Sequence, residues 1–590
     1  MSQEKTKDMS QYFYRASAAD FMKIPGSPVA YWVDEIVRHS FLAGESFESL
    51  ATPRQGLGTG NNSRFTRLWY EIDRGRLTLG CASKSDALAS KAKWFPYTKG
   101  GGFKKWYGNE IDVVNWENDG AEIRLALKGM NPNIPRSEEH YFKKGITWGL
   151  ITSANFSARI TDAGAIFDVG GSKAMPSEEN YFPVLGILNS KISGFLLKTL
   201  NPTLNFQVGD LKKLPIVGLH KQQNLKKLVQ RLVDISKADW NSKETSLGFI
   251  TAPILSYNKN KIAEAWAELM VHEKNLIEEV KKSEFYLNRE LISIYGLEGT
   301  LNPEISPAEV SLECNPAYIY RTEDESEKIA SRFRSERLSE LISFSIGLMF
   351  GRYSLDREGL VYAKFGNKGF SNLVAEGAFK TFPADEDGVI PLTDQEWFAD
   401  DATNRFREFV RVVWGDEHLQ ENLDFVAESL CLHAIKPKRG ESALDTIRRY
   451  LSTQFYKDHM RTYKKRPIYW LFSSGKHKAF ECLVYLHRYN DGTLARMRTE
   501  YVIPLTAKLT AYADKLEQDK AASASAAETK RLEKEINTLH KQQAELAEFD
   551  EKLRHYADQR IALDLDDGVK VNYGKFGDLL ADVKVVTGVK

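Results

Sequence analysis

Between residues 91 and 109 the chain interleaves lysines with aromatic residues and contains no acidic residue. The lysines and aromatic residues are Lys91, Lys93, Lys99, Lys104, Lys105, Trp94, Phe95, Tyr97, Phe103, Trp106 and Tyr107. Ammonium groups pair with phosphates, aromatic rings stack on bases, and the glycines at 100–102 let the backbone approach a ligand closely. The stretch predicts nucleic-acid contacts, chiefly from Lys99, Lys104, Lys105, Trp106 and Tyr107. A β-hairpin with a glycine tip, inward-facing rings and solvated lysines explains the same pattern, and both interpretations can hold together.

A second basic cluster lies between residues 461 and 470. Its cations and aromatic residues are Arg461, Lys464, Lys465, Arg466, Tyr463, Tyr469 and Trp470. The cluster predicts a second edge for phosphate contact, formed by Lys464, Lys465 and Arg466. A solvated face beside a buried strand would place the same residue types there. Arg64, in the glycine-containing stretch 54–72, is a further predicted contact.

Other patterns imitate catalytic or cofactor sites without meeting their requirements. The glycines at 56–60 do not follow a buried apolar strand, as those of a nucleotide-binding loop do. NPAY at 315–318 has one proline fewer than the [DNS]-P-P-[YFW] motif of amino-methyltransferases, whose polar residue holds the target amine of a flipped base. SSGKHK at 473–478 lacks the spacing of a phosphate-binding loop, and DLDDG at 564–568 predicts a capped turn rather than a calcium loop. We therefore expect no catalytic, cofactor or metal residues here.

Composition narrows the class of protein. A chain of 590 residues is long enough for three or four domains of ~100–200 residues each. Its 81 basic and 80 acidic residues give a net charge of +1, so that any nucleic-acid surface must be a local patch. Four scattered cysteines without a C-x-x-C pair predict reduced thiols, and no run reaches the ~18 apolar residues of a membrane helix. We expect a cytoplasmic protein without a membrane partner.

Hydrophobic periodicity predicts an α+β protein with several domains. Two long antiparallel helices, joined by a short loop, are expected between residues 221 and 300. Leucines recur seven residues apart at Leu532, Leu539, Leu546 and Leu553, which predicts an antiparallel helical hairpin over 504–560. Residues 301–503 mix helix-like and strand-like runs.

The phrase NPTLNFQVGDLKKLPI, residues 201–216, follows an apolar, helix-like run. Pro202 stops that helix, since the residue before a proline is pushed out of the helical region and proline has no N–H to donate. Gly209 and Asp210 predict a second turn, and Pro215 an extended exit. A structural hinge accounts for these features.

The amino-acid sequence of this phrase resembles the end of the first target-recognition repeat in bacterial DNA adenine methyltransferases and type I specificity subunits. Together with GLGTGNNSRFTRLWYE, KGGGFKKWYGN, IGLMFGRYSLDREGL, YKKRPIYWLFSSGKHKAFECLVYLHRY and DLDDGVKVNYGKFG, it resembles the PglX family over nearly the whole chain. That family comprises adenine-specific DNA methyltransferases of bacteriophage exclusion (BREX) defence systems. Its members also have a catalytic domain with a cofactor glycine motif and N-P-P-Y, and neither motif occurs in these 590 residues. The chain resembles the C-terminal half.

The resemblance implies a role for each region. We expect a linker and N-terminal helix at 1–50, a mixed α/β target-recognition domain at 51–220, a helical spacer at 221–300, a C-terminal α+β domain at 301–503, the hairpin at 504–560 and a tail at 561–590. The implied partners are double-stranded DNA, a separate methyltransferase half and other BREX subunits. S-adenosylmethionine is expected in a catalytic domain outside this chain, so that the chain alone should not methylate DNA. The alternatives are an assembly subunit with incidental DNA contact, and an intact enzyme with an unrecognised catalytic domain.

Overall fold

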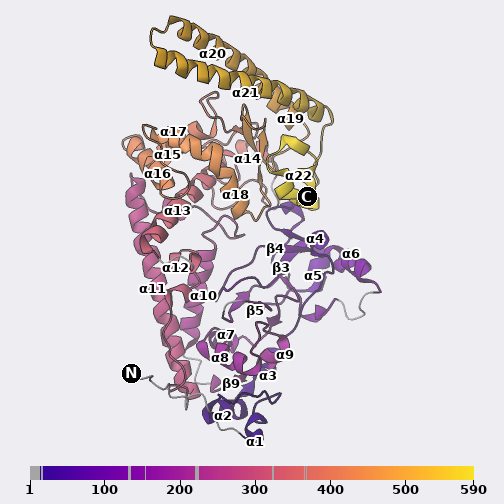
Figure 1. Ribbon diagram of the computed structural model, residues 1–590. Coiled ribbons are helices and arrows are strands. Elements are labelled where there is room, and N and C mark those ends of the chain that lie inside the picture. Colours follow the sequence, from indigo (N-terminus) through magenta and orange to yellow (C-terminus); the bar gives the residue numbers. More distant parts are fainter. Residues whose placement is uncertain are drawn as a thin grey trace, which may run out of the picture. The chain divides into compact units, whose positions relative to one another are not determined.

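The computed structural model describes residues 14, 17–129, 135–152, 155–219, 225–321, 325–364, 366 and 368–589. The chain divides into two compact units, each formed by segments that are separated in sequence. Unit 1 comprises Met1–Thr66, Leu77–Asn241 and His272–Arg321, and unit 2 comprises Arg67–Arg76, Ser242–Val271 and Thr322–Lys590. The predicted α+β class is confirmed, because long helices accompany several small sheets (Figure 1).

Short strands in unit 1 place the glycine-rich and basic segments. Strand β3 (Trp94–Thr98) pairs antiparallel with β4 (Asp112–Asn115) and parallel with β7 (Ile166–Phe167). Strand β5 (Gly145–Trp148) lies between β6 (Ala158–Thr161) and β8 (Lys173–Ala174), and β1 (Glu45–Ser46) pairs with β9 (Pro215–Ile216). The β3–β4 pair, whose connection contains the glycines, confirms the hairpin and its inward-facing rings, but the second strand begins only at Asp112. The expected solvation of all its lysines is wrong, because Lys104 and Lys105 are buried.

The helices of unit 1 contribute to two separate apolar clusters. These helices are α1 (Ala18–Phe21), α2 (Glu35–Ala43), α3 (Phe47–Ala51), α4 (Asn62–Phe65), α5 (Lys84–Ala89), α6 (Glu117–Leu127), α7 (Tyr181–Leu188), α8 (Lys191–Leu200), α9 (Val208–Lys212), α10 (Lys226–Trp240), α12 (Pro316–Ile319) and the C-terminal part of α11 (Ile262–Tyr295). Almost every residue of α7 is buried, and it packs on α8, α10 and β6. Its predominantly apolar sequence suits a helix that is covered on all sides.

The phrase at 201–216 folds largely as its turn residues predict. Helix α8 ends at Leu200, and Asn201 has an extended backbone before Pro202. The predicted second turn is wrong, because Gly209 and Asp210 lie inside the short helix α9. The extended exit is confirmed as strand β9.

The two long helices expected at 221–300 are confirmed as α10 and α11. The prediction that a short loop joins them is wrong. Residues 241–261 connect them, and Ser242–Val271 belongs to unit 2. Within unit 1, Arg231 of α10 donates to Glu279 of α11 at 2.7 Å. The buried faces of both helices contribute to one core. Periodicity identified each helix, whereas the path of the connection depended on tertiary packing.

Unit 2 combines a three-stranded antiparallel sheet with helices. Strand β12 (Glu481–Tyr485) lies between β10 (Val389–Pro391) and β11 (Tyr469–Ser473). The helices are α13 (Ser326–Met349), α14 (Phe370–Ala375), α15 (Ala402–Trp414), α16 (Leu419–Cys431), α17 (Ala443–Tyr450), α18 (Tyr456–Thr462), α19 (Thr493–Arg496), α20 (Ile503–Ala522), α21 (Ala526–Asp558), α22 (Gly568–Gly574) and α23 (Val583–Thr587). Strands β11 and β12 are almost entirely buried, as expected for the core of this unit.

The predicted helical hairpin at 504–560 is confirmed. Helices α20 and α21 run side by side and are joined at residues 523–525 (Figure 1). The heptad leucines Leu532, Leu539, Leu546 and Leu553 are all buried. DLDDG forms the predicted capped turn, in which the Asp564 side chain accepts from the Asp566 N–H at 3.0 Å. Among the described residues, no helix combines the length and the apolar character needed to cross a membrane.

Candidate nucleic-acid interface

The glycine-rich loop after β3 has a backbone that only glycines adopt readily. Gly100 and Gly101 have φ angles of +82° and +94°, a region that is costly for side chains with a Cβ. A Cβ on Gly100 would lie 2.4 Å from the carbonyl oxygen of Gly170, whereas a Cβ on Gly102 would meet nothing within 4 Å. The loop is therefore packed on one side and open on the other, which leaves its backbone within reach of a ligand.

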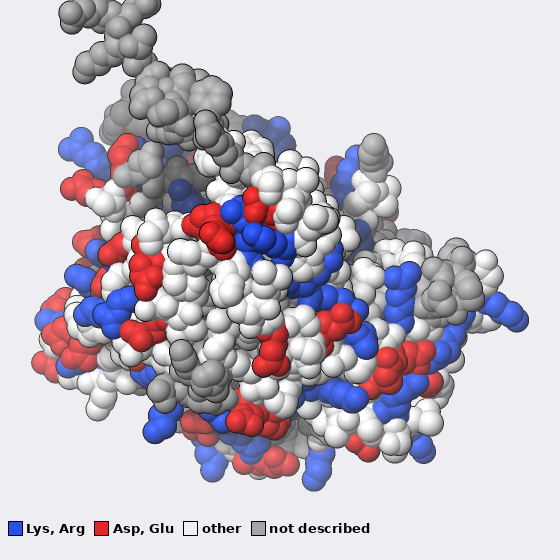
Figure 2. Space-filling model, turned by 90° about the horizontal axis from the view of Figure 1, so that it is seen from below, with Lys and Arg blue, Asp and Glu red and all other residues white. Residues whose placement is uncertain are grey.

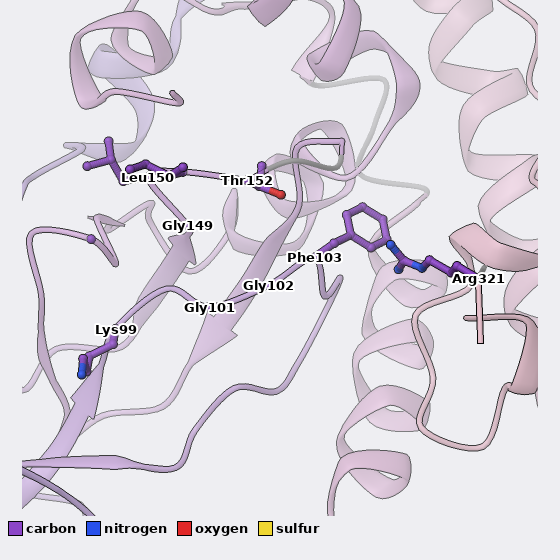
Figure 3. Close-up of a pocket in the computed structure, with 10 residues that line it drawn as sticks. Lys99, Gly101, Gly102, Phe103, Gly149, Leu150, Thr152 and Arg321 are labelled. Carbon is purple, nitrogen blue, oxygen red and sulfur yellow. The ribbon is translucent and has the colours of Figure 1, made fainter. Parts of the chain in front are cut away.

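The open side of this loop lines a pocket with a volume of about 480 Å³ (Figure 3). The lining residues are Lys99, Gly101, Gly102, Phe103, Gly149, Leu150, Ile151, Thr152, Gly170 and Arg321. They come from four parts of unit 1: the loop after β3, the segment after β5, the connection between β7 and β8, and the end of the 272–321 segment. The volume is within the range of small-ligand pockets.

Two cations at this pocket differ in how they are held. The Arg321 guanidinium is exposed and lies 5.1 Å from the Phe103 ring centroid and 4.4 Å from that of Tyr318. Its Nε donates to the Tyr318 carbonyl at 3.1 Å, and none of its contacts with described residues is to a carboxylate. Lys99 pairs with Asp112 at 3.4 Å. In Figure 3, Arg321 points toward the Phe103 ring and Lys99 lies away from this pair. The pocket thus offers positive charge, an aromatic ring and accessible backbone.

The NPTLNFQ part of the sequence phrase packs against the wall of the same pocket. Asn205 forms an antiparallel bridge with Ile151. The Phe206 N–H donates to the Leu150 carbonyl at 2.8 Å, and the Trp148 indole donates to the Phe206 carbonyl at 3.0 Å. Phe206 is buried, whereas its neighbours Asn205 and Gln207 reach solvent. This part of the segment therefore holds Leu150 and Ile151, two residues of the pocket wall, in place through its backbone.

Lys104 and Lys105 require a correction of the sequence-based expectation. Their exposed fractions are 1% and 6%, and both ammonium groups pair with carboxylates of this chain. The Nζ atom of Lys104 lies 2.7 Å from Glu313 and 3.8 Å from Asp239. Lys105 lies 2.7 Å from Glu284. These lysines connect the loop after β3 to distant segments of unit 1 and do not form the basic surface that their spacing suggests.

The electrostatics of Lys104 support this structural role. Burial alone would lower its pKa, but the charges of Glu313 and Asp239 outweigh burial and the pKa lies above its ordinary value. Asp239 also accepts from the backbone N–H groups of Glu313 at 2.6 Å and Cys314 at 2.9 Å. The group is thus a hydrogen-bonded buried ion pair, which is the form in which buried charges are tolerated.

The remaining predicted contacts of unit 1 do not line the pocket. Trp106 is buried, and its indole donates to Glu284 at 2.7 Å. Tyr107 is half-buried, with the Lys237 ammonium 5.0 Å from its ring centroid. Arg64 is exposed and lies 3.4 Å from Glu122. Of the six predicted residues in unit 1, the structure brings only Lys99 to the pocket.

The second basic cluster lies at the surface of unit 2. Lys464 and Lys465 are exposed and have φ angles of 51° and 57°, which is unusual for non-glycine residues. Their N–H groups donate to carbonyls of α18, so that they cap its C-terminus, where cations are favourable. Arg466 lies 3.8 Å from Glu71, also in unit 2. The interpretation as a solvated face beside the buried strand β11 is confirmed.

This cluster also lines a second pocket with a volume of about 480 Å³. The lining residues are Lys457, Met460, Arg461, Lys464, Lys465, Asp582 and Val585. Arg461 pairs with Asp458 at 3.2 Å. Arg461 is paired with carboxylates outside the lining, so the positive charge of this hollow comes chiefly from Lys457, Lys464 and Lys465, against Asp582.

The motifs that imitate catalytic sites have structural roles. Asn315 of NPAY caps α12: its side-chain Nδ2 donates to Pro307 at 2.8 Å and Val310 at 2.7 Å, and its Oδ1 accepts from Ala317 at 3.1 Å. The Gly56 loop packs so closely that a Cβ there would lie 1.9 Å from the Phe167 carbonyl oxygen. Both segments therefore have a structural role in this fold. Among the described residues, no cluster of three or more His, Cys, Asp or Glu could hold a metal ion.

Arg321 is the pocket residue that sequence reasoning missed. It closes the segment ECNPAYIYR, more than 200 residues after the glycine loop in the chain. The available signal was the tyrosine three residues earlier, which holds the guanidinium. Only tertiary structure shows which pocket this pair faces.

No family model matches the chain, but two curated relatives match almost all of it. Adenine-specific methyltransferase BrxX of Escherichia coli O9:H4 (strain HS) is 50% identical over 576 residues, covering 96% of this chain and 46% of the relative. Adenine-specific methyltransferase PglX of Lacticaseibacillus casei (strain Zhang) is 37% identical over 599 residues, covering 98% of this chain and 46% of the relative. The resemblance that the sequence phrases predict is thereby confirmed. Over almost its whole length the chain is similar to these two adenine-specific methyltransferases, BrxX and PglX, and it spans just under half the length of each.

Proposed function

We propose that this chain is the DNA-recognition region of a BREX-type, adenine-specific DNA methyltransferase, and that the pocket of unit 1 contacts the DNA. The supporting observation is the convergence of three segments at one pocket. These are the glycine loop with Lys99, Arg321 with its guanidinium over the Tyr318 ring, and the NPTLNFQ segment, which pairs with the pocket residue Ile151. Each supplies a chemistry that DNA recognition uses.

The pocket suits a phosphate-bearing ligand with a planar base. Guanidinium and ammonium groups attract phosphates, and open glycine backbone can donate hydrogen bonds to phosphate oxygens. The Phe103 ring beside Arg321 provides an apolar and aromatic surface. Amide side chains are the groups that form paired hydrogen bonds with adenine, and Asn205, whose backbone pairs with the pocket residue Ile151, and Gln207 both reach solvent. Phosphate contacts would position the chain, and the amides would read bases.

Methyl transfer is assigned to the part of the relatives that this chain does not match. In support of this assignment, the side chain of Asn315, the polar residue of NPAY, is engaged in capping α12. S-adenosylmethionine would supply the methyl group when bound to a catalytic domain. We expect no incorporation of label when this chain alone is incubated with DNA and labelled S-adenosylmethionine, and substantial incorporation would contradict this assignment.

The test is a fluorescence anisotropy titration of the chain against DNA duplexes over a series of salt concentrations. Arg321→Ala should weaken binding and reduce the log–log salt slope by about 0.9, the value for one lost phosphate contact. Arg289→Ala is the matched control, since Arg289 is also exposed and also lies over a tyrosine three residues earlier, at 5.0 Å. No DNA binding, or equal slopes for wild type and Arg321→Ala, would overturn the proposal.

The basic hollow of unit 2 would provide a second phosphate contact. Lys464 and Lys465 are exposed, and no carboxylate among the described residues pairs with either. Their combined replacement by alanine should reduce the salt slope by about 2 without changing the preference among DNA sequences. An unchanged slope would leave helix capping as their role.

A further inference from the structure

The carbonyl oxygens of the glycine-rich loop after β3 are held by side chains of this chain. Asn109, in the connection between β3 and β4, donates from its Nδ2 atom to the Gly100 carbonyl at 3.3 Å and to the Gly102 carbonyl at 3.1 Å. The Tyr318 hydroxyl donates to the Phe103 carbonyl. Because a carbonyl oxygen can only accept a hydrogen bond, these three groups already have the kind of partner that they need.

A buried arginine holds the same loop from the interior of unit 1. Arg159 lies on β6 and is 1% exposed. Its guanidinium donates to the Gly100 carbonyl and, at 3.4 Å, to the Lys104 carbonyl. A buried carbonyl that loses its donor pays the full cost of desolvation, so these contacts resist any rotation of the loop. The inward direction of the Gly100 carbonyl is therefore fixed by two side chains, Arg159 and Asn109.

The N–H groups of the loop show the opposite pattern. Among the described residues, none accepts a hydrogen bond from the N–H groups of Gly101, Gly102 or Phe103. The N–H group that follows is used, because that of Lys104 donates to the Ser157 hydroxyl at 3.2 Å. Gly101, Gly102 and Phe103 all line the pocket of unit 1 (Figure 3). Successive N–H groups at a pocket present partial positive charge, which suits an anion.

The distribution of charge favours recognition by such an array. Basic and acidic side chains are interspersed over the face of the molecule that Figure 2 shows, in keeping with a net charge of +1. Where charges of both signs are mixed, a phosphate is recognised by groups that are aimed at it rather than by a broad positive field. The loop offers neutral N–H groups for this purpose, and Arg321 is an exposed cation of the same pocket.

We propose that Asn109 is a positioning residue for phosphate recognition. By holding the carbonyls of Gly100 and Gly102, it presents the N–H groups of the loop to one phosphate of the DNA backbone. This inference rests on the proposed function and adds to it the atoms that meet the phosphate and the side chain that orients them.

The local sequence suits this arrangement. Asn109 has a φ angle of 64°, in the left-handed region that asparagine adopts more readily than most residues with a Cβ. A Cβ on Gly101 would lie 2.7 Å from the Nδ2 atom of Asn109. The amide can therefore reach across the loop only because position 101 is a glycine.

The test compares two asparagine-to-glycine variants of the full chain. Asn109→Gly removes the amide and leaves a residue that accepts a positive φ angle without strain. Asn118→Gly is the matched control, since Asn118 also lies in unit 1 and has a φ angle of 51°. The Asn118 side chain is exposed and bonds to no described residue. Thermal unfolding of both variants measures their effect on stability.

The first measurement is an NMR titration of the chain, labelled with ¹⁵N-glycine, against inorganic phosphate. The Gly102 amide signal, identified by its absence from Gly102→Ala, should shift in the wild-type chain and in Asn118→Gly. In Asn109→Gly the shift should be lost, because the N–H groups are no longer held toward the pocket. A contact that only stabilises the fold would lower the unfolding midpoint and leave this shift intact.

The second measurement is DNA binding by fluorescence anisotropy. Asn109→Gly should weaken binding about three- to tenfold, the loss expected for one or two hydrogen bonds. The log–log salt slope should stay at the wild-type value, because counterion release follows the charged contacts and the N–H groups are neutral. This result would differ from that of Arg321→Ala, which should reduce the slope.

Two outcomes would overturn the role of Asn109. One is a response of the Gly102 signal to phosphate that is the same in the wild type and Asn109→Gly, including no response in either. The other is equal DNA affinity of these two chains when both bind. If the wild-type chain bound no DNA but lost its phosphate response in Asn109→Gly, the proposed function would fail, and the positioning role would hold for a free phosphate group.

Discussion

Replacing Lys104 should disrupt the stability of unit 1 and leave its DNA contacts intact. In Lys104→Met, Glu313 and Asp239 lose the ammonium that lies 2.7 and 3.8 Å from their carboxylates. At an effective dielectric constant of about 20, the closer pair alone corresponds to about 6 kcal/mol of Coulomb energy. The desolvation of both ions offsets much of this energy. Removal of one partner from a buried pair typically costs about 3–5 kcal/mol.

The structure places the expected loss at the lower end of that range. The Glu313 side chain is 25% exposed and can be rehydrated. Asp239 keeps two backbone N–H donors, at 2.6 and 2.9 Å. We therefore expect a loss of about 3 kcal/mol, which corresponds to a fall of about 5 °C in the unfolding midpoint of a unit of this size. Because the Lys104 pKa is raised in the folded chain, this stabilisation is complete below the unfolded pKa of about 10.4 and is lost as the pH rises through the folded pKa.

The assay pairs thermal unfolding with the salt dependence of DNA binding. Lys99→Met is the control from the same loop, because Lys99 lines the pocket and its side chain is 31% exposed. We expect Lys104→Met to lower the unfolding midpoint with an unchanged salt slope, and Lys99→Met to do the reverse, with a slope change of about 0.9. The reasoning would be refuted if Lys104→Met kept the wild-type midpoint and reduced the salt slope.

Three further predictions test the loop, the core and the hairpin. Burial lowers the pKa of Lys173 to about 8, partly offset by Glu110. Wild-type stability should therefore fall as the pH drops from the unfolded pKa of about 10.4 to about 8, and level off below that. Lys173→Met should flatten this dependence in urea titrations and raise the free energy of unfolding by about 2 kcal/mol at neutral pH, and a parallel pH profile would contradict the prediction. Gly100→Ala would place a Cβ 2.4 Å from the Gly170 carbonyl oxygen. This substitution should lower the free energy of unfolding by at least about 1 kcal/mol and weaken DNA binding, as measured by fluorescence anisotropy. Gly102→Ala should change neither quantity. Leu546 occupies a fully buried heptad position. Leu546→Ala should lower the free energy of unfolding by about 2–5 kcal/mol and speed hydrogen exchange in α20 and α21, and DNA affinity should stay unchanged.

Sequence reasoning worked best where local patterns dictate structure. The heptad leucines predicted the hairpin of α20 and α21, since residues seven apart share one face of a helix. Pro202 marked the end of α8 because proline cannot continue the helical hydrogen bonding. The family relationship also followed from the sequence, because specific phrases persist along nearly the whole chain. These features require no knowledge of distant contacts.

The functional surface was harder to predict, because the same residue type serves different roles in different surroundings. Lys99 and Lys104 are five residues apart in one basic stretch, yet one lines a pocket and the other is buried between carboxylates. The partners that decide this, Asp239 and Glu313, lie more than 130 residues later in the chain. A sequence window shows the ammonium group but not the carboxylates that neutralise it.

The amino-acid sequence by itself determined the fold class, the long helices, the hairpin and the family to which the chain is related. Tertiary structure alone decided which cations are available at the surface, and it brought Arg321 to the glycine loop. It also showed that Asn315 caps a helix and that Trp32 is exposed beside a buried core. The reason is physical: periodicity and turn chemistry act over a few residues, whereas burial and ion pairing depend on residues that only the folded chain brings together.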